Sequence, residues 1–503
     1  MLKGVSVLPA LSAGRAFLLI AVCLLAPVTS AHDSPQILDE PLKEIQLPQL
    51  PEDDHSGGLI AHDLDGDGQM DFLVTRSGNV IAVKVDGSIL WHHDVDVQVT
   101  YRSEENGLPG NHGPGVQAAD VTGDGDVEVL YLTRGGELLV VQGATGEEIH
   151  RVSIEAPEEA ERWEHLVVGN FRGEGDRDLL LQATNAEGYR MGRFIAAYSI
   201  RDLMEHDAPQ PLWTRDDFHA AAHNGARIAD LNGDGRDEII GGSIVSPDGE
   251  ELFEAPVRGH YRSPMHAHID AVQVANVRPD RPGLEVVALE EGGRFRLLPF
   301  DNDFAHWVNY QFNKVWGAGE RTFLMGVDGL IWASHHPLQF EPQNVAVGSF
   351  KRGSDDVQIW LRSRFDRDQR PYVFNAEGDL IASYKLTEVA PDDWTRAGIE
   401  VIVPIHWTGT GQQHLAATAR HESGDVAIID ALTGKFQVRI PERADRLYVA
   451  DVLGDWREEL IVLSGNRMRI YGNTAENPNP DRPSLWSQQH YQRSKQTWNY
   501  YSP

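Results

Sequence analysis

The sequence predicts an all-β protein, an eight-bladed β-propeller, with a seven-bladed ring as the alternative. An acidic, glycine-rich turn recurs along the chain at intervals of about 55 residues, which indicates a repeat architecture. A short apolar strand enters each turn, a strand rich in β-branched residues leaves it, and a second strand pair follows. About four strands per repeat, without an amphipathic helix, are typical of propeller blades rather than helical solenoid turns.

The repeats are strongest where the turn keeps its aspartates. These copies are AHDLDGDGQMDFLVT at 61, AADVTGDGDVEVLYL at 118 and IADLNGDGRDEIIGG at 228, and weaker copies begin at 168, 274, 347, 402 and 449. The faint copy at 402 is the reason why seven blades remain an alternative. The last copy, VADVLGDWREELIVL, has Trp456 where a glycine is expected.

Three turns carry oxygen-bearing side chains at positions 1, 3, 5 and 9, as a calcium loop would, without the helices of an EF-hand. They resemble FG-GAP turns and consist of Asp63, Asp65, Asp67 and Asp71; Asp120, Thr122, Asp124 and Glu128; and Asp230, Asn232, Asp234 and Glu238. We expect Ca²⁺ in these turns, and the alternative is an acidic turn that is merely solvated. The copies at Asn170 and Asn276 lack ligands, so calcium loading should differ between blades.

The net charge and the N-terminal segment restrict the possible binding partners and the location of the protein. The 503 residues have a formal net charge of −32, which disfavours binding to nucleic acid and to anionic membranes. Residues 1–31 are predicted to be a signal peptide with the apolar run AFLLIAVCLLAPV, and they contain the only cysteine, Cys23. We therefore expect a secreted or periplasmic protein with a linker over 32–51 and one propeller over 52–503, ended by an aromatic closing segment.

Histidines outside the repeat pattern predict a second kind of metal site. Four of the 21 histidines lie seven or eight residues before the first position of a turn: His55, His112, His223 and His268. They should gather at one mouth of the channel, unless the spacing is a coincidence. His268 and Asp270 would point to the same side of a strand, and Glu291 ends the run that follows as its partner strand. With His223 they would form a site of nitrogen and oxygen ligands.

Several stretches resemble the propeller-fold rhamnogalacturonan lyases, a polysaccharide lyase family with a calcium-bearing eight-bladed propeller. They are HNGARIADLNGDGRDEI, HIDAVQVANVRPDRPGLEVVALEE and, near the C-terminus, LGDWREE, MRIYGNT, RPSLW and HY. The likeness covers roughly residues 220–495. The chain departs from the family in the Gln-His pair before Tyr491, in Gln492, in Gln343 where the family tends to have arginine, and in lacking an N-terminal immunoglobulin-like domain.

The resemblance implies calcium-dependent β-elimination on a uronate-containing polysaccharide. A cation would neutralise the uronate carboxylate and acidify the neighbouring proton, and a side chain would remove that proton. By resemblance, the catalytic metal ligands are His223, His268, Asp270 and Glu291. Tyr491, its pKa lowered by Arg493 or Lys495, would be the base or acid, with His336 as a further catalytic candidate and simple packing of the tail aromatics as the alternative. Rhamnogalacturonan is the default substrate, and ulvan or another rhamnose–uronate polymer is the rival.

Two other functions stay open. A non-catalytic calcium-binding propeller for glycan binding or adhesion explains the acidic turns equally well, but it gives no reason for the His–Asp–Glu set. A quinoprotein-type dehydrogenase would account for GATGEEIHR and DALTGKFQV, although these are ordinary blade turns and no cofactor-binding set accompanies them.

Overall fold

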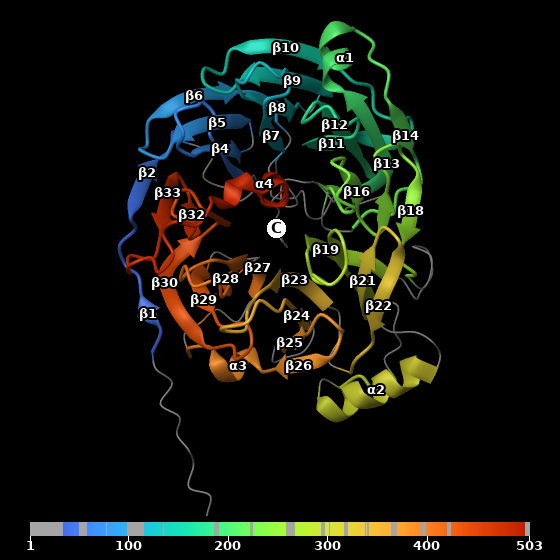
Figure 1. The fold of residues 1–503 in the computed structure, drawn as a ribbon, viewed down its shortest axis with the longest axis vertical. Helices are drawn as coiled ribbons and strands as arrows, with labels where there is room; N and C mark the ends of the chain where they lie inside the picture. The colour runs from blue at the N-terminus through green and yellow to red at the C-terminus, as the bar shows by residue number, and fades with distance from the viewer. Residues whose placement is uncertain are drawn as a thin grey trace, which may run out of the picture. The chain divides into compact units, whose positions relative to one another are not determined.

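In the computed structural model the described residues are 34–49, 58–76, 78–97, 115–133, 135–185, 191–221, 225–257, 267–292, 297–300, 302–315, 320–337, 339, 342–363, 370–392, 394, 399–419 and 424–497. The chain divides into two units, Met1–Ser34 and Pro35–Pro503, and the propeller is the second. Its described strands form eight sheets in a ring (Figure 1). The eight-bladed prediction is thereby confirmed, and the copy at 402 is a genuine blade.

The first four sheets follow one another in sequence. Their strands are β3 (Leu59–His62), β4 (Asp71–Arg76), β5 (Asn79–Lys84) and β6 (Ile89–Asp94); β7 (Val116–Ala119), β8 (Glu128–Leu132), β9 (Glu137–Gln142) and β10 (Glu148–Ser153); β11 (Ala160–Gly169), β12 (Asp178–Asn185), β13 (Met191–Ser199) and β14 (Trp213–Arg215); and β15 (Arg227–Ala229), β16 (Glu238–Ile240), β17 (Ser243–Val245) and β18 (Glu251–Glu254).

The other four sheets complete the ring. Their strands are β19 (Ala267–Ala275), β20 (Glu285–Gly292), β21 (Arg321–Gly326) and β22 (Gly329–Ser334); β23 (Pro342–Gly348), β24 (Gln358–Ser363), β25 (Pro371–Phe374) and β26 (Leu380–Ser383); β27 (Ile399–Ile405), β28 (His414–Ala419), β29 (Gly424–Ile429) and β30 (Phe436–Ala444), joined by β1 (Gln36–Ile37); and β31 (Arg446–Ala450), β32 (Glu459–Ser464) and β33 (Arg467–Tyr471), joined by β2 (Lys43–Gln46).

Burial explains the sequence pattern of the strands. The inner two strands of a blade are covered on both faces, so β8 has the run EVLYL with every residue buried, whereas the outer strand β10 is mostly exposed. Apolar clusters fill the space between neighbouring sheets. One of them joins Ile60 and Leu73 of the first blade to Val129 and Tyr131 of the second.

The N-terminal segment closes the ring, which corrects the prediction of a linker over 32–51. β2 pairs antiparallel with β33 and supplies the outer strand of the last sheet, and β1 pairs in parallel with β30 of the sheet before it. Ile45 of β2 is buried in the cluster that also contains Phe72 of the first blade and Ile461 of the last. Within the described residues, the first and last parts of the chain therefore share one core.

Helices are more frequent than the sequence analysis expected. They are α1 (Ile200–Glu205), α2 (Asp303–Val315), α3 (Leu386–Val389), the 3₁₀ turn η2 (Leu485–Ser487) and α4 (Gln489–Gln496). α4 lies at the centre of the ring and contacts the inner strands β3 and β15 (Figure 1). Among the described residues, no helix is both long and apolar enough to cross a membrane.

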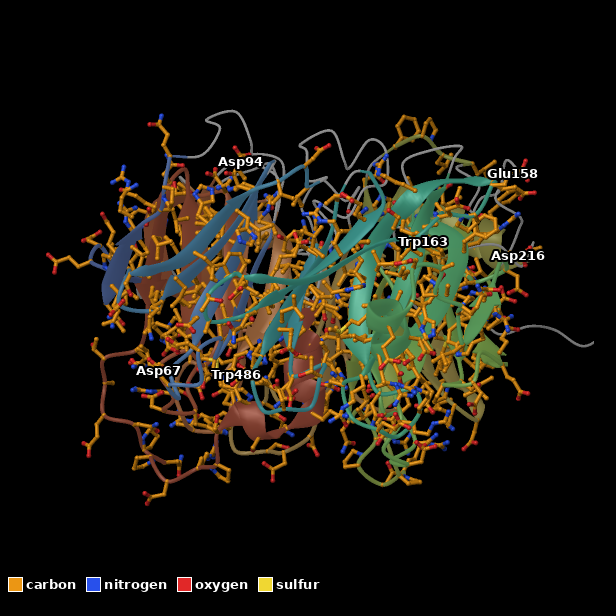
Figure 2. All side chains as sticks on the ribbon, turned by 90° about the horizontal axis from the view of Figure 1, so that it is seen from above. Asp67, Asp94, Glu158, Trp163, Asp216 and Trp486 are labelled. Carbon is orange, nitrogen blue, oxygen red and sulfur yellow. The ribbon has the colours of Figure 1, made fainter. Side chains whose placement is uncertain are left out.

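The two faces of the ring differ in what they carry. Each inner strand runs directly into a Gly-rich turn, so these turns share one face, here called the turn face, on which Asp67 and Trp486 lie (Figure 2). Asp94, Glu158 and Asp216 lie on the opposite side, where the inner strands begin, here called the entry face (Figure 2). A metal centre at the start of an inner strand is therefore separated from the turns by the length of that strand.

Candidate metal centre at the entry face

His268, Asp270 and Glu291 come together at the entry end of the fifth blade. His268 of β19 pairs directly with Glu291 of β20 in the antiparallel ladder. The His268 Nε2 atom lies 3.7 Å from Asp270 Oδ1 and 3.4 Å from Glu291 Oε2. One ligand atom from each residue lies within 4.8 Å of the other two, and both carboxylates are buried. His223, the fourth predicted ligand, lies outside the described residues, as do His55 and His112.

This donor set fits a divalent cation. Burial, and then the neighbouring Glu291 carboxylate, raise the pKa of Asp270 above its ordinary value. Two carboxylates held this close cannot both ionise easily without a positive charge between them. A cation at this position would remove that penalty, and an imidazole with two carboxylates is a common ligand combination for divalent metals.

Gln343 of β23 extends the centre toward the sixth blade. Its Nε2 atom donates to Glu291 Oε2 at 3.4 Å, and its Oε1 atom is buried without a hydrogen-bond partner among the described residues. The ladder is irregular between Gln343 and Val345, and Asn344 has a φ of 53°. Such a bulge re-aims a side chain, which here directs the Gln343 amide at Glu291.

Sequence analysis missed Arg362, which brings a positive charge to this region. Arg362 pairs with Gln343 in the ladder, and its Nη2 atom donates to Asn344 Oδ1 at 3.3 Å. Only 1% of the side chain is exposed. The sequence shows only an arginine that follows the apolar run IWL, and the structure adds that every residue of this strand is buried.

His336 lies in the connection that returns from the outer strand β22 to the inner strand β23. Its backbone N–H donates to Gln339 Oε1, and the Gln339 amide donates to Thr322 Oγ1 at the start of β21. Burial lowers the pKa of His336, so its imidazole is neutral at neutral pH. β22 ends at Ser334, two residues before His336, and the inner strand β23 begins at Pro342 on the entry face.

Tyr491 and Arg493 do not join this centre. His490, next to Tyr491 in α4, is hydrogen-bonded to the backbone of Val274. Val274 is six residues along β19 from His268, which corresponds to about 20 Å of strand. The two catalytic candidates from the tail therefore lie on the turn face, at the opposite end of the channel.

Both tail residues are held by contacts within the protein. Tyr491 Oη donates to Glu458 Oε1 at 3.0 Å and accepts from the Asp451 N–H at 2.9 Å. Burial, and then Glu458, raise the pKa of Tyr491 well above its usual value, so the expected lowering by Arg493 or Lys495 is wrong. Arg493 instead pairs with Asp237 at 2.8 Å, and Lys495 pairs with Glu458 at the same distance.

A cavity of about 390 Å³ adjoins α4 on the turn face. Tyr491, Arg493 and Lys495 line it together with inner-strand residues such as Gln273 and Val403. His406, also in the lining, is buried with a pKa lowered to about 4, chiefly by burial. Carboxylates hold Arg493 and Lys495, whereas Arg227, also in the lining, donates to the carbonyl and hydroxyl oxygens of Thr497. His490 lines the cavity as well, and burial lowers its pKa to about 4. The basic side chains distinguish this cavity from the carboxylate-rich entry face.

The predicted calcium turns share one hydrogen-bonding scheme. The carboxylate at position 9 accepts backbone N–H groups from the start of the turn, as Asp71 does from Leu64, Glu128 from Val121 and Glu238 from Leu231. The carboxylate at position 1 accepts from the glycine at position 6, for example Gly235 N–H to Asp230 Oδ2 at 2.9 Å. These bonds shape the turn but leave other oxygen atoms available to a cation.

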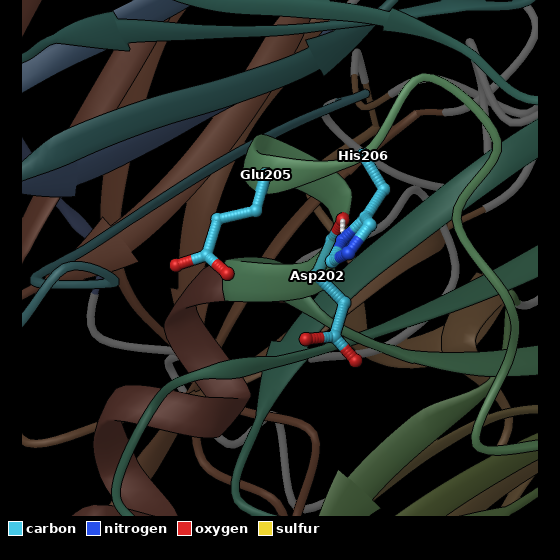
Figure 3. Close-up of side chains that lie close together, drawn as sticks. All are labelled: Asp202, Glu205 and His206. Atoms are coloured by element: carbon cyan, nitrogen blue, oxygen red, sulfur yellow. Dashed lines mark hydrogen bonds between the residues drawn. The ribbon is translucent and has the colours of Figure 1, made fainter.

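A third acidic cluster was not predicted and carries no ligand argument. Asp202, Glu205 and His206 lie close together at the end of the short helix α1 (Figure 3). The spacing of one helical turn alone brings them together. The His206 Nδ1 atom already lies 3.2 Å from the Asp202 carbonyl oxygen, and Glu205 and His206 are exposed. This cluster is best described as a solvated helix end.

Comparison with known proteins finds two kinds of similarity, one to a repeat family within residues 63–131 and one to lyases over most of the chain. The FG-GAP-like repeat family matches residues 63–131, which include the first two acidic turns. The rhamnogalacturonan endolyase YesW of Bacillus subtilis is 24% identical over 485 residues, covering 82% of this chain and 66% of the endolyase. The exolyase YesX of the same organism is 23% identical over 480 residues, covering 82% of this chain and 70% of the exolyase.

The solved structure of a rhamnogalacturonan lyase from Bacillus licheniformis superposes with a TM-score of 0.60 over 92% of this chain and 80% of that one, at 19% identity. Over most of its length the chain is similar to rhamnogalacturonan lyases in sequence and fold. This chain spans 66% of the length of the endolyase that it matches. The resemblance seen in the sequence is therefore confirmed, and the fold it implied is the fold observed.

Proposed function

We propose that this protein is a metal-dependent polysaccharide lyase that cleaves a uronate-containing polymer by β-elimination at the entry face. The observation that carries the proposal is the buried His268–Asp270–Glu291 centre, which stands outside the repeat pattern of the turns. The two lyase relatives from Bacillus subtilis support the reaction class. A rhamnogalacturonan-like polymer is the first substrate to test, and an ulvan-like polymer is the second.

The proposed chemistry assigns each residue a task. His268, Asp270 and Glu291, with His223 as a fourth candidate, would hold the cation, which the resemblance identifies as calcium. When bound, the cation neutralises the uronate carboxylate and acidifies the adjacent carbon-bound proton. Gln343 holds Glu291 in place through its amide. Arg362, the cross-strand partner of Gln343, supplies a fixed positive charge, which favours binding of an anionic substrate at the entry face.

His336 is the proposed proton acceptor among the described residues. A general base must be neutral before it acts, and burial lowers the pKa of His336 so that this condition is met near neutral pH. Tyr491 and Arg493 were also candidates, but their contacts with Glu458, Asp451 and Asp237 indicate that they fix α4 instead. We therefore propose a positioning role for α4 and a catalytic role for His336.

Export is part of the proposal. The apolar, positively flanked segment over residues 1–31 supports secretion or transfer to the periplasm, where large polysaccharides are found. A net charge of −32 would repel a polyanionic substrate at long range. The entry face must therefore present a local positive charge, and the cation with Arg362 would provide it.

The decisive experiment follows the ultraviolet absorbance of the unsaturated uronate product. The protein is incubated with pectic and algal uronans, with calcium, with other divalent cations or with a chelator. We expect a metal-dependent rise on one polymer class, which Asp270→Asn and Glu291→Gln reduce by about a hundredfold or more. Glu205→Gln is the matched control, because it removes the same charge from an acidic cluster outside the centre.

Two further variants distinguish the role of helix α4 from that of the connection between β22 and β23. Tyr491→Phe should keep cleavage, with some loss of stability because the Asp451 N–H loses its acceptor. His336→Ala should abolish cleavage while leaving metal content unchanged. If glycan binding persists and no polymer is cleaved under any metal condition, the protein is the non-catalytic glycan-binding propeller instead.

A further inference from the structure

Lys84 of the first blade occupies half of a predicted calcium site. Its Nζ atom lies 2.5 Å from Asp65 Oδ2 and 2.6 Å from Asp67 Oδ2, the carboxylates at positions 3 and 5 of the first turn. Lys84 pairs across the ladder with Asp71, the residue at position 9. An ammonium group therefore sits where two of the four ligand side chains would meet a metal ion.

The other half of the same site is built for a cation and remains open. Asp63 Oδ1 and Asp71 Oδ1, at positions 1 and 9, are buried and have no hydrogen-bond partner among the described residues. Asp63, Asp65 and Asp71 offer ligand atoms within 4.8 Å of one another. Buried carboxylate oxygens without donors are costly, which points to a missing positive charge. The first turn thus combines a metal-like donor set with a lysine.

The equivalent positions in five other blades carry no positive charge. At the end of the third strand of a blade, or one residue beyond it, a backbone N–H donates to a carbonyl oxygen across the hairpin that follows, as the Lys84 N–H donates to the Ser88 carbonyl. Gln142, Ser246, Asn375 and Asp430 make the same bond in their blades. Ser199 faces Asp178 across the ladder of the third blade, as Lys84 faces Asp71. These five residues are neutral or acidic, so the lysine is specific to the first turn.

Turns that lack the full oxygen pattern contain basic side chains paired with their carboxylates. Each of three such turns has an arginine bonded to its own carboxylate. Arg172 Nε lies 2.6 Å from Asp178 Oδ1, Arg278 Nη2 lies 2.7 Å from Asp280 Oδ2, and Arg457 Nε lies 2.9 Å from Asp455 Oδ2. In these three turns, a basic side chain of the chain itself therefore neutralises a turn carboxylate.

We propose that Lys84 is a tethered competitor for calcium in the first turn. When calcium is scarce, the ammonium neutralises Asp65 and Asp67 and holds the turn in its folded shape. When calcium binds with all four side chains, Lys84 must move out to solvent. The first turn would then be the weakest and most reversible of the three predicted calcium turns, because no ion pair among the described residues joins a basic side chain to the ligand carboxylates of the second and fourth turns. The inference rests on the proposed calcium loading of the turns and not on the proposed lyase activity.

Calcium titration of two reciprocal variants tests the competition. Lys84→Gln gives the first turn the residue found in the second, and Gln142→Lys does the reverse. By isothermal titration and equilibrium dialysis of the whole protein, Lys84→Gln should strengthen one calcium site by about tenfold or more, since a unit charge is removed at contact distance. Gln142→Lys should weaken one site. In chelator, Lys84→Gln should melt at a lower temperature than the unmodified protein.

Lys351→Gln is the matched control. Lys351 lies in the sixth turn, where it is 60% exposed and 4.0 Å from Asp356, and its removal changes the net charge by the same amount. It should leave the calcium isotherm unchanged. Equal isotherms and equal melting shifts for Lys84→Gln and the unmodified protein would overturn the proposal. Because no sugar is involved, the result is independent of whether the protein cleaves a polysaccharide. If Gln142→Lys fails to fold, the Lys84→Gln titration still decides.

Discussion

Trp456 shows how one residue turns an acidic turn of the calcium-loop type into a contact surface for another part of the same chain. It has a φ of 72°, the left-handed conformation that glycines adopt at the same position of other turns, for example Gly68 and Gly235. Its N–H donates to Asp451 Oδ2 as those glycines donate to their own position 1. The indole gains contacts in return, because Arg482 stacks on it with its guanidinium carbon 3.9 Å from the ring centre.

Ring contacts and backbone strain act in opposite directions at Trp456, and together they predict an order of stability for its variants. Trp456→Ala loses the ring contacts and keeps the left-handed conformation, whereas Trp456→Gly loses the contacts and relieves the backbone. We expect both variants to be less stable than the unmodified protein, with glycine more stable than alanine by about 1 kcal/mol. Urea unfolding of the three proteins measures the order. An alanine variant as stable as the glycine variant would contradict the assigned strain.

His165 should make stability fall in acid. It is buried on β11, and its Nε2 atom donates to the Ala226 carbonyl at 3.0 Å. Burial lowers its pKa to about 4. Below an unfolded pKa of about 6.5 the unfolded chain takes up a proton that the folded chain refuses, so stability is lost as the pH falls toward 4.

The expected cost for His165 is about 2 kcal/mol between pH 7 and pH 5. His165→Gln can keep a donor to the carbonyl without titrating, so its stability should depend less on pH over that range. Urea unfolding at both pH values measures the difference between the two proteins. Parallel losses in the two proteins would show that His165 is not responsible, and the buried His406 and His490 would then be examined in the same way.

At the scale of elements, ring closure depends on a four-residue strand. β2 supplies the outer edge of the last sheet although it comes from the N-terminal part of the chain. Its residues alternate, since Ile45 is 2% exposed while Glu44 and Gln46 face solvent. The strand thus covers the edge of β33, which would otherwise present unpaired backbone groups.

Neighbouring substitutions in β2 should differ strongly in effect. Ile45→Ala should lower the free energy of unfolding by about 3 kcal/mol, because Ile45 packs in the cluster shared by the first and last blades. Glu44→Ala removes an exposed ion pair with Arg469 and should cause no measurable loss. Thermal unfolding of both variants tests this contrast. Comparable losses would mean that β2 acts through its surface charges instead of through core burial.

At the scale of the whole molecule, the charge of −32 makes cations part of the stability. Self-repulsion among carboxylates weakens a compact state, and salt screens this repulsion in a general way. Bound calcium acts differently, since it stabilises only the folded chain that forms its sites. The two effects can be separated by comparing salts at one ionic strength.

Calcium should therefore raise the melting temperature more than sodium at matched ionic strength. At about a hundred times the dissociation constant, each occupied site contributes about 2.7 kcal/mol to the folded state. Differential scanning calorimetry in sodium, in calcium and in chelator measures the difference. Identical melting temperatures in the two salts would show that the turns of Asp120 and Asp230 are only solvated acidic loops.

The sequence by itself determined the repeat, its acidic turns and part of the candidate metal centre. The 55-residue spacing, the Asp-Gly turns and the pairing of His268 with Asp270 are local or periodic features, so they are visible without coordinates. The sequence also placed Glu291 at the end of the partner strand, and the ladder pairs it directly with His268. Eight blades were predicted because each repeat has its own inner strand, whereas the choice of eight over seven was made by the sheet that contains the copy at 402.

Only the tertiary structure decided which distant residues share a site. α4 comes after the last blade, and nothing local shows that it docks on the turn face, about a strand length from His268. The strands β1 and β2 look like a linker because their partners lie some 400 residues away in sequence. Arg362 and Lys84 acquire their roles only through cross-strand neighbours. Periodic burial fixes the blades, whereas closure of the ring and the charges at its two mouths depend on long-range contacts that a linear pattern does not contain.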